Sequence, residues 1–245
     1  MALVLAFAST GAANAQTQSD DRTMLWQGLA TGMTPEEALP AVHQIGGVKR
    51  AKVLKERKSN PERRIDIDYV TAKIPIANLP FELGPIFKDG RLSQVLLAAR
   101  NQCGANATQV LSQLTTGLRG KYADAIGAPE LSDRDFREAE RNSLVSGEPS
   151  TVATAFANGE VAVFLTFRVT VEARPPYPTS YSKLGYSLWQ LANLQYEQRQ
   201  AECSGTGDRR VDVVLIYMPR SASDAARADT AAEQRDKADR IADQL

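Results

Sequence analysis

The longest alternating segment of the chain constrains its fold more than any other feature. Large apolar side chains occupy every second position from 161 to 171: Val161, Val163, Leu165, Phe167, Val169 and Val171. Successive side chains of a strand point to opposite faces, so this spacing predicts a long strand with one buried and one partly wet face. Residues 151–157 precede it, and Asn158-Gly159 between the two runs predicts a hairpin.

Further strands are expected on both sides of this hairpin. Residues 51–57 and 64–78 have extended patterns, but the apolar phase shifts near 70–73, which indicates a bulge or a break between two strands. Asp89-Gly90 stands between two apolar runs and predicts a second hairpin. Residues 211–218 form the last predicted strand.

Helix signals lie between these strands. Thr34, Pro35 and Glu37 match a capping box with proline at the first helical position, and Pro40 should kink or shorten that helix. Asn106 is a candidate cap for a second helix, whose apolar face is Leu111, Leu114, Leu118 and Tyr122. A short helix from Ser132 and a helix over 181–202 follow. The sum predicts an α+β fold, with short helices packed on one face of a mostly antiparallel β-sheet in a single domain.

The N-terminal segment, residues 1–15, resembles a secretory signal. An apolar run leads through small residues to Ala13-Asn14-Ala15, a pattern that signal peptidase cleaves, so cleavage is expected after Ala15. The segment has no Lys or Arg near its start, and a disordered apolar terminus is the alternative. Residues 16–24 are then a flexible leader, residues 25–220 the single α+β domain, and residues 221–245 an Ala-rich charged tail, either a marginal helix or disordered.

The export predicted from residues 1–15 agrees with the cysteine content of the chain. No other run approaches the length of a transmembrane segment, so a periplasmic protein without a transmembrane segment is expected. In an oxidising compartment Cys103 and Cys203 most simply form a disulfide, and two separate buried thiols are the alternative. Neither belongs to a C-x-x-C pair, so no zinc site is expected.

The sequence gives little support for nucleic-acid binding, for metal binding or for glycoside hydrolysis. The chain has 29 Lys and Arg against 29 Asp and Glu, so its net charge gives no argument for nucleic acid. His43 is the only histidine, which excludes His-based metal clusters, and no metal or cofactor is expected. Asp66 and Asp68 share one strand face and have the separation of a glycosidase pair, but a solvated face explains them as well.

Two stretches are candidate binding surfaces. The densest basic stretch could meet an acidic polymer or an acidic partner, or could be a charged strand edge; it comprises Lys49, Arg50, Lys52, Lys55, Arg57, Lys58, Arg63 and Arg64. An aromatic stretch could form an interface, or could complete the core; it comprises Tyr177, Tyr181, Tyr186, Trp189 and Tyr196.

Two motifs resemble a known family. Gly32-Met33-Thr34-Pro35-Glu36-Glu37 and Phe87-Lys88-Asp89-Gly90-Arg91-Leu92 are similar to the helix start and strand turn of small bacterial envelope proteins of the BamE (SmpA/OmlA) type. The β-lactamase-inhibitor proteins are built on a similar plan. The resemblance covers about residues 25–100 and implies two helices packed on a short antiparallel sheet. It implies a non-enzymatic role in outer-membrane protein assembly, and it transfers no binding residue.

These observations lead to one expected function and two alternatives. The chain is expected to be an exported, non-enzymatic envelope protein that binds another macromolecule, an unknown envelope protein or an acidic polymer. A secreted enzyme inhibitor or immunity-type protein is the first alternative. A hydrolase that uses Asp66 and Asp68 is the second.

Overall fold

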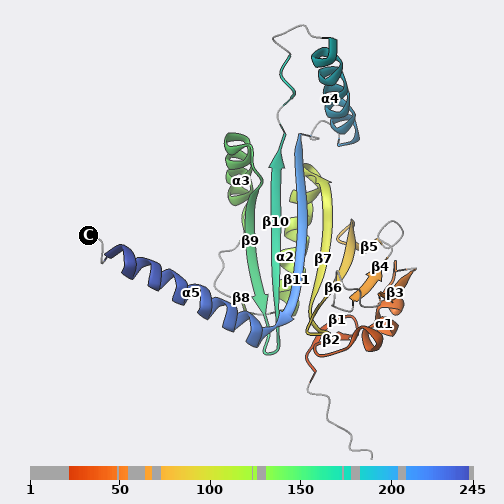
Figure 1. The fold of residues 1–245 in the computed structure, drawn as a ribbon, viewed down its shortest axis with the longest axis vertical. Coiled ribbons are helices and arrows are strands. Elements are labelled where there is room, and N and C mark those ends of the chain that lie inside the picture. The colour runs from red at the N-terminus through yellow and green to blue at the C-terminus, as the bar shows by residue number, and fades with distance from the viewer. Residues whose placement is uncertain are drawn as a thin grey trace, which may run out of the picture.

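A seven-stranded antiparallel sheet organises the molecule (Figure 1). The computed structural model describes residues 22–48, 50–54, 64–67, 73–122, 124–125, 131–172, 174–177, 183–203 and 208–242. The strand order is β5-β6-β7-β11-β10-β9-β8. These strands are β5 (Ile74–Ile76), β6 (Leu79–Lys88), β7 (Arg91–Cys103), β8 (Asp124–Ala125), β9 (Ser150–Ala157), β10 (Val161–Val171) and β11 (Arg209–Pro219).

Two small sheets and five helices complete the described structure. The small sheets pair β1 (Met24–Trp26) with β2 (Leu29–Ala30), and β3 (Ala51–Leu54) with β4 (Arg64–Ile67). The helices are α1 (Pro35–Gln44), α2 (Gly104–Lys121), α3 (Asp133–Ser146), α4 (Lys183–Glu202) and α5 (Arg220–Ala242). Among the described residues, no helix is both long enough and apolar enough to cross a membrane.

One face of the sheet carries the core. Phe136 of α3 packs edge-on against Phe167 of β10, with ring centroids 5.8 Å apart. Tyr122 at the end of α2 and Trp26 of β1 both lie against Tyr217 of β11, and each ring centroid is 6.4 Å from that of Tyr217. Phe167 and Tyr217 project from the same face, because both belong to the buried alternate positions of paired strands. The predicted α+β fold, with helices on one face of an antiparallel sheet, is confirmed.

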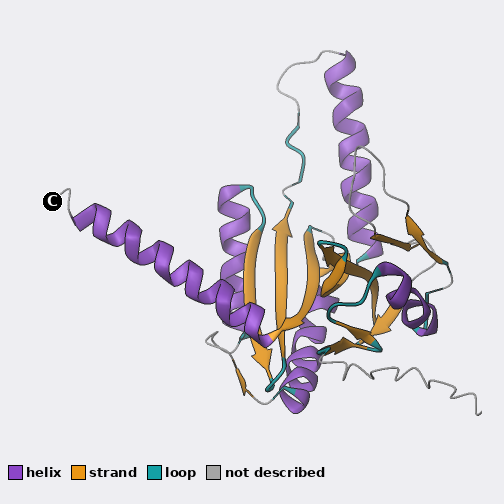
Figure 2. Cartoon of the chain, turned by 60° about the horizontal axis from the view of Figure 1, so that its bottom comes forward, coloured by secondary structure: helices purple, strands orange, loops and turns teal. Residues whose placement is uncertain are grey.

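The opposite face is only half-buried. Phe164, Ile216 and Leu96 stand opposite one another on β10, β11 and β7, and each is partly exposed. The helices α2 and α3 lie on the other side, and α5 touches β10 and β11 only near its start before it leaves the sheet (Figure 2). An antiparallel sheet can leave one face wet in this way, as the alternation of β10 predicts.

Local sequence signals form the predicted turns and helix starts. Asp89 and Gly90 both have positive φ, 53° and 71°, as a tight hairpin turn between twisted strands requires. Asn158 closes the other hairpin, because its side-chain oxygen accepts hydrogen bonds from the backbone N–H groups of Glu160 and Val161. Capping boxes start α1 at Thr34 and α3 at Ser132.

The structure also corrects several predicted boundaries. The shift near 70–73 separates β4 and β5, which belong to different sheets. Helix α2 begins at Gly104 after Cys103, without a side-chain cap, so Asn106 lies inside the helix and does not cap it. Pro40 lies inside α1, which is ten residues long.

The domain boundaries shift as well. The described structure includes residues before 25, because β1 starts at Met24 and the backbone N–H of Thr31 donates to the carbonyl of Thr23. The last residues of the predicted leader, residues 16–24, therefore take part in the small β1–β2 sheet. Of the two alternatives for the tail, the structure has the helix, and α5 starts directly after β11.

Gly47, just beyond α1, offers a matched test of backbone geometry. Its φ is 95°, and a Cβ added there would overlap the carbonyl oxygen of Lys73. We expect Gly47→Ala to lower the free energy of unfolding by at least about 2 kcal/mol, because strain and overlap add. Gly46→Ala, where a Cβ meets open space, is the control and should change it by less than about 0.5 kcal/mol in urea unfolding. Equal effects at both positions would contradict this geometry.

Tyr217 should make the fold sensitive to alkaline pH. Burial raises the pKa of its phenol well above the usual value of 10.0, and the neighbouring Tyr122 raises it further. Above about pH 10 an unfolded tyrosine loses its proton while folded Tyr217 keeps it, so stability falls as pH rises. Urea unfolding between about pH 8 and pH 11 should show this decline, and Tyr217→Phe should reduce it. The same change at exposed Tyr177 serves as the control.

Candidate functional site

The connection between β10 and β11 leaves the sheet and forms the candidate site. We call its described residues, 172, 174–177, 183–203 and 208, the arm. Its helix, α4, stands beyond the ends of the strands (Figures 1 and 2) and packs extensively against no other described helix or strand. The two strands that carry it are paired along their whole length, up to Val171 opposite Arg209. The arm is therefore a projecting element on a rigid support.

Ion pairs hold the base of the arm. Glu172 binds Arg199 of α4 at 2.6 Å with one carboxylate oxygen and Arg210 of β11 at 2.5 Å with the other. All three side chains are about 30% exposed, so water screens these pairs only in part. Above them, Arg174 binds Glu197 at 2.9 Å and Asn193 at 3.1 Å. The start of the arm is thus tied along the second half of α4.

The predicted disulfide is present at the same end. Cys103 closes β7 and Cys203 follows α4, with their Cα atoms 5.4 Å apart. Cys103 also pairs with Arg210 across the sheet, so the bridge joins the foot of α4 to the ladder itself. Together with the ion pairs of Glu172, it fixes where the arm leaves the sheet.

Three of the five predicted aromatic residues come together on the arm. Trp189 lies 4.8 Å from Tyr177 and 5.8 Å from Tyr186, measured between ring centroids. Its indole N–H donates to the carbonyl of Pro175 at 3.3 Å, which fastens α4 to the loop segment 174–177. Tyr177 is 53% exposed and Tyr186 37% exposed, so the cluster does not complete the core. Tyr196 lies apart from the cluster, nearer the sheet, and Tyr181 is outside the described residues.

A leucine face covers another side of α4. Leu188, Leu191 and Leu194 are 58%, 54% and 62% exposed. Residues three apart on a helix are neighbours, so these side chains form one continuous stripe. Leu188 and Leu191 were visible in the sequence as part of a helix, but nothing there showed that they face water. Charged residues normally identify the solvent-exposed face of a helix, and residues 184–196 contain no Asp, Glu, Lys or Arg.

A groove lies between α3 and the base of the arm. Its volume is about 460 Å³. Its lining combines arginines and carboxylates with a few apolar side chains: Arg137, Glu140, Arg141, Leu144, Val171, Glu172, Arg174, Tyr196, Asp208 and Arg209. Apart from Tyr196, these residues were not predicted as a site, because they come from three separate segments with no shared motif.

The predicted basic stretch does not form a described surface. Arg50 and Lys52 lie in the described residues at and before β3, and the backbone of Arg64 lies in β4. The other members, Lys49, Lys55, Arg57, Lys58 and Arg63, are outside the described residues, as is Asp68. Asp66 stands opposite Lys52 on β4, and only its backbone is described. Within the described part of the chain, no group of His, Cys, Asp and Glu side chains could hold a metal ion.

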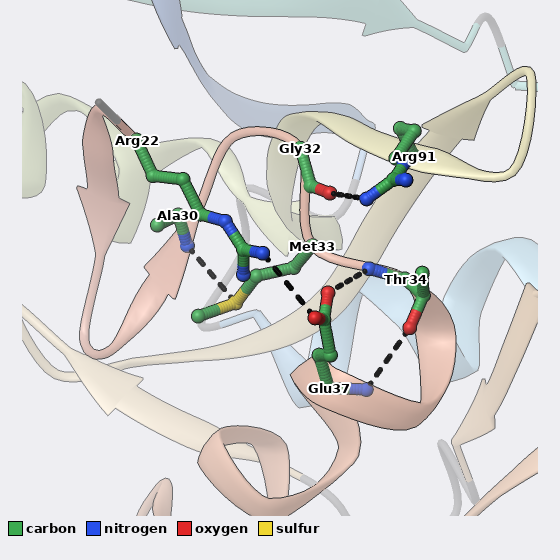
Figure 3. A network of polar contacts seen from close by, with 7 residues as sticks. All are labelled: Arg22, Ala30, Gly32, Met33, Thr34, Glu37 and Arg91. Carbon is green, nitrogen blue, oxygen red and sulfur yellow. Dashed lines mark hydrogen bonds and ion pairs between the residues drawn. The ribbon is translucent and has the colours of Figure 1, made fainter. Parts of the chain in front are cut away.

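The two motifs of the family resemblance contact one another (Figure 3). The N–H of Gly32 donates to the carbonyl of Leu92 at 2.9 Å, and the N–H of Leu92 donates to the carbonyl of Met33 at 2.7 Å. Arg91 also donates to the carbonyl of Gly32 at 2.9 Å. These bonds join the start of α1 to the β6–β7 hairpin. The residues of both motifs therefore have a structural role, which is to hold these two elements together. Among the described residues of 25–100 there is one helix, α1, where the resemblance implies two.

The carboxylate of Glu37 lies beside this contact between the two motifs. The backbone N–H of Thr34 donates to Glu37 at 2.8 Å, and Arg22 binds its other oxygen at 3.2 Å. The Thr34 bond, and then Arg22, hold the pKa of Glu37 below its usual value. The carboxylate is already occupied as a cap, so this contact positions α1 and offers no free acid or base.

Reduction of the disulfide should loosen the arm. The bridge closes a loop of 100 residues, so Cys103→Ser with Cys203→Ser should lower the free energy of unfolding by up to about 4–5 kcal/mol. Amide hydrogen exchange should rise in α4 more than in β10, because β10 keeps both neighbouring strands. A reducing agent should reproduce this in the unaltered protein and have no effect on the double variant. Unchanged exchange in α4 would contradict an anchoring role.

Comparison of the chain with protein-family models, with curated proteins and with solved structures finds no match. The resemblance to envelope proteins of the BamE type therefore stays a prediction.

Proposed function

We propose that this protein is exported to the periplasm and acts there as a non-enzymatic binding protein, which holds another protein of the envelope through its arm. The observation behind this proposal is the leucine face of α4. Three leucines, each more than half exposed, form one stripe on a helix that projects away from the sheet. Large exposed apolar surfaces of this kind mark interaction sites in proteins that stay in solution.

The neighbouring aromatic cluster supports the same proposal. Tyr and Trp are enriched at protein interfaces, because a rigid aromatic side chain adds contact area at little entropic cost. Trp189 and Tyr186 are already held in place by one another and by Pro175. A partner that docks along α4 would therefore meet a surface that needs little further ordering.

Export is supported by two independent features. The apolar run before Ala15 has the order of a secretory signal. The disulfide between Cys103 and Cys203 fits an oxidising compartment. The inhibitor alternative uses the same projecting arm, and the identity of the bound protein separates the two, since an inhibitor binds and blocks an enzyme.

Site-specific cross-linking tests the arm. A photo-reactive residue in place of Leu191 should cross-link one envelope protein in living cells. The same residue in place of Ala226, on the exposed part of α5, is the matched control and should not cross-link it. Adding Leu188→Gln and Leu194→Gln should abolish the cross-link and change the free energy of unfolding by less than about 0.5 kcal/mol, since both leucines face water. No cross-link at 191, or the same product from 226, would contradict the proposal.

Fractionation tests the export part separately. The protein recovered from periplasm should begin at Gln16, as N-terminal sequencing or intact mass will show. A cytoplasmic protein that still begins at Met1 would contradict export without bearing on the arm.

A further inference from the structure

We propose that the groove between α3 and the base of the arm binds an acidic segment of the partner protein, whose carboxylates pair with Arg137 and Arg141. This inference rests on the proposed function, because it names the chemistry of the partner that α4 holds. It adds a second, polar contact to the apolar contact of the leucine face.

The outer face of α3 is built for such a contact. Arg137, Arg141 and Leu144 are spaced by four and three residues, which places them on one helical face, and all three line the groove. The opposite face of α3 is buried against the sheet through Phe136 and Ala139. The two guanidinium groups therefore cannot turn inward, and they project beside the arm.

The groove has unpaired positive charge. Its carboxylates already have partners: Glu140 binds Arg209 at 3.6 Å, Glu172 binds two arginines, and Asp208 is also engaged. Arg174 is engaged by Glu197. Within the described residues, Arg137 and Arg141 have no ion-pair or hydrogen-bond partner. Two adjacent cations without a counter-charge, in a partly enclosed groove, favour an anionic ligand.

The apolar part of the lining further restricts the class of ligand that fits the groove. Leu144 is 59% exposed, and it faces the groove together with Val171 and Tyr196. The volume of about 460 Å³ falls in the range of ligand sites and is too large for a single small anion. In an acidic segment that also contains apolar side chains such as leucine, the carboxylates can pair with the arginines and the apolar side chains can contact Leu144 and Val171. A long polyanion such as nucleic acid fits less well, because its phosphate backbone has no apolar side chains to meet Leu144 and Val171.

The arm itself points to a protein as the source of these carboxylates. Tyr196 belongs to α4 and forms one wall of the groove. Arg174 and Glu172 belong to the start of the arm. A protein that docks on α4 therefore lies next to the groove, and one partner can contact both surfaces.

A labelled peptide tests the groove without the partner. The probe is fluorescein-Glu-Leu-Glu-Glu-Leu-Glu, and its matched control replaces every Glu by Gln. Fluorescence anisotropy with the full mature chain should show binding of the acidic peptide at least about tenfold tighter than of the Gln peptide. Its dissociation constant should rise between about 0.03 M and about 0.3 M salt, because the contact is electrostatic.

Variants of α3 locate the contact. Arg137→Gln with Arg141→Gln should weaken binding of the acidic peptide by about tenfold or more. Arg134→Gln is the matched control, since Arg134 lies on the same helix, is exposed and does not line the groove; it should change binding less than about twofold. Circular dichroism should show that both variants keep the fold.

The inference would be overturned by equal binding of the two peptides, by no binding of either, or by equal losses from Arg134→Gln and the double variant. Tight binding of dodecanoate without binding of the peptide would also overturn it, in favour of a lipid ligand. Failure of the peptide assay thus contradicts the groove, and failure of the cross-link contradicts the arm.

Discussion

The rest of the structure depends on the pairing of β11 between β7 and β10. Strands β5, β6 and β7 pair in sequence order, and so do β8, β9 and β10. Among the described strands only β11, the last of them, joins the two halves, with Leu215 opposite Leu97 on one side and opposite Leu165 on the other. All three leucines are buried on the helix-covered face, so the same strand closes both the hydrogen-bond ladder and the core.

The irregularity in this pairing explains where the arm is attached. The register of β7 against β11 shifts between Val211 and Val213. Asn101 takes a left-handed conformation there, with φ 54°, and its N–H donates to the Asp212 carboxylate at 2.8 Å. A bulge bends its strand, and beyond this one β7 reaches Cys103 beside Arg210. Disulfide, bulge and ion pairs therefore converge on one corner, and the arm and groove are both built on it.

Elements with local causes, and the aromatic residues of the arm, could be predicted from the sequence, whereas the leucine face and the groove could not. Alternation along β10, the Asp89-Gly90 turn and the capping box at Thr34 are set by near neighbours, and all three formed as expected. The start of α2 was misplaced, because Cys103 takes the cap position as the strand runs directly into the helix, with no side chain to mark it. The groove needs α3, β10 and the arm together, and no local pattern encodes their contact. The exposure of Leu191 is equally invisible, since an apolar helix position usually means burial.

The place of the arm in the connectivity has a consequence for how such a protein can change. Val171 and Arg209 are direct neighbours across the β10–β11 ladder, so the arm begins and ends at adjacent points. Geometrically, it is an enlarged hairpin connection. Insertions, deletions or replacement of the whole segment leave the register of every strand as it is, because the ladder and not the connection aligns β10 with β11. The leucine and aromatic surfaces of α4 can thus diversify while the ladder between β10 and β11 stays constant.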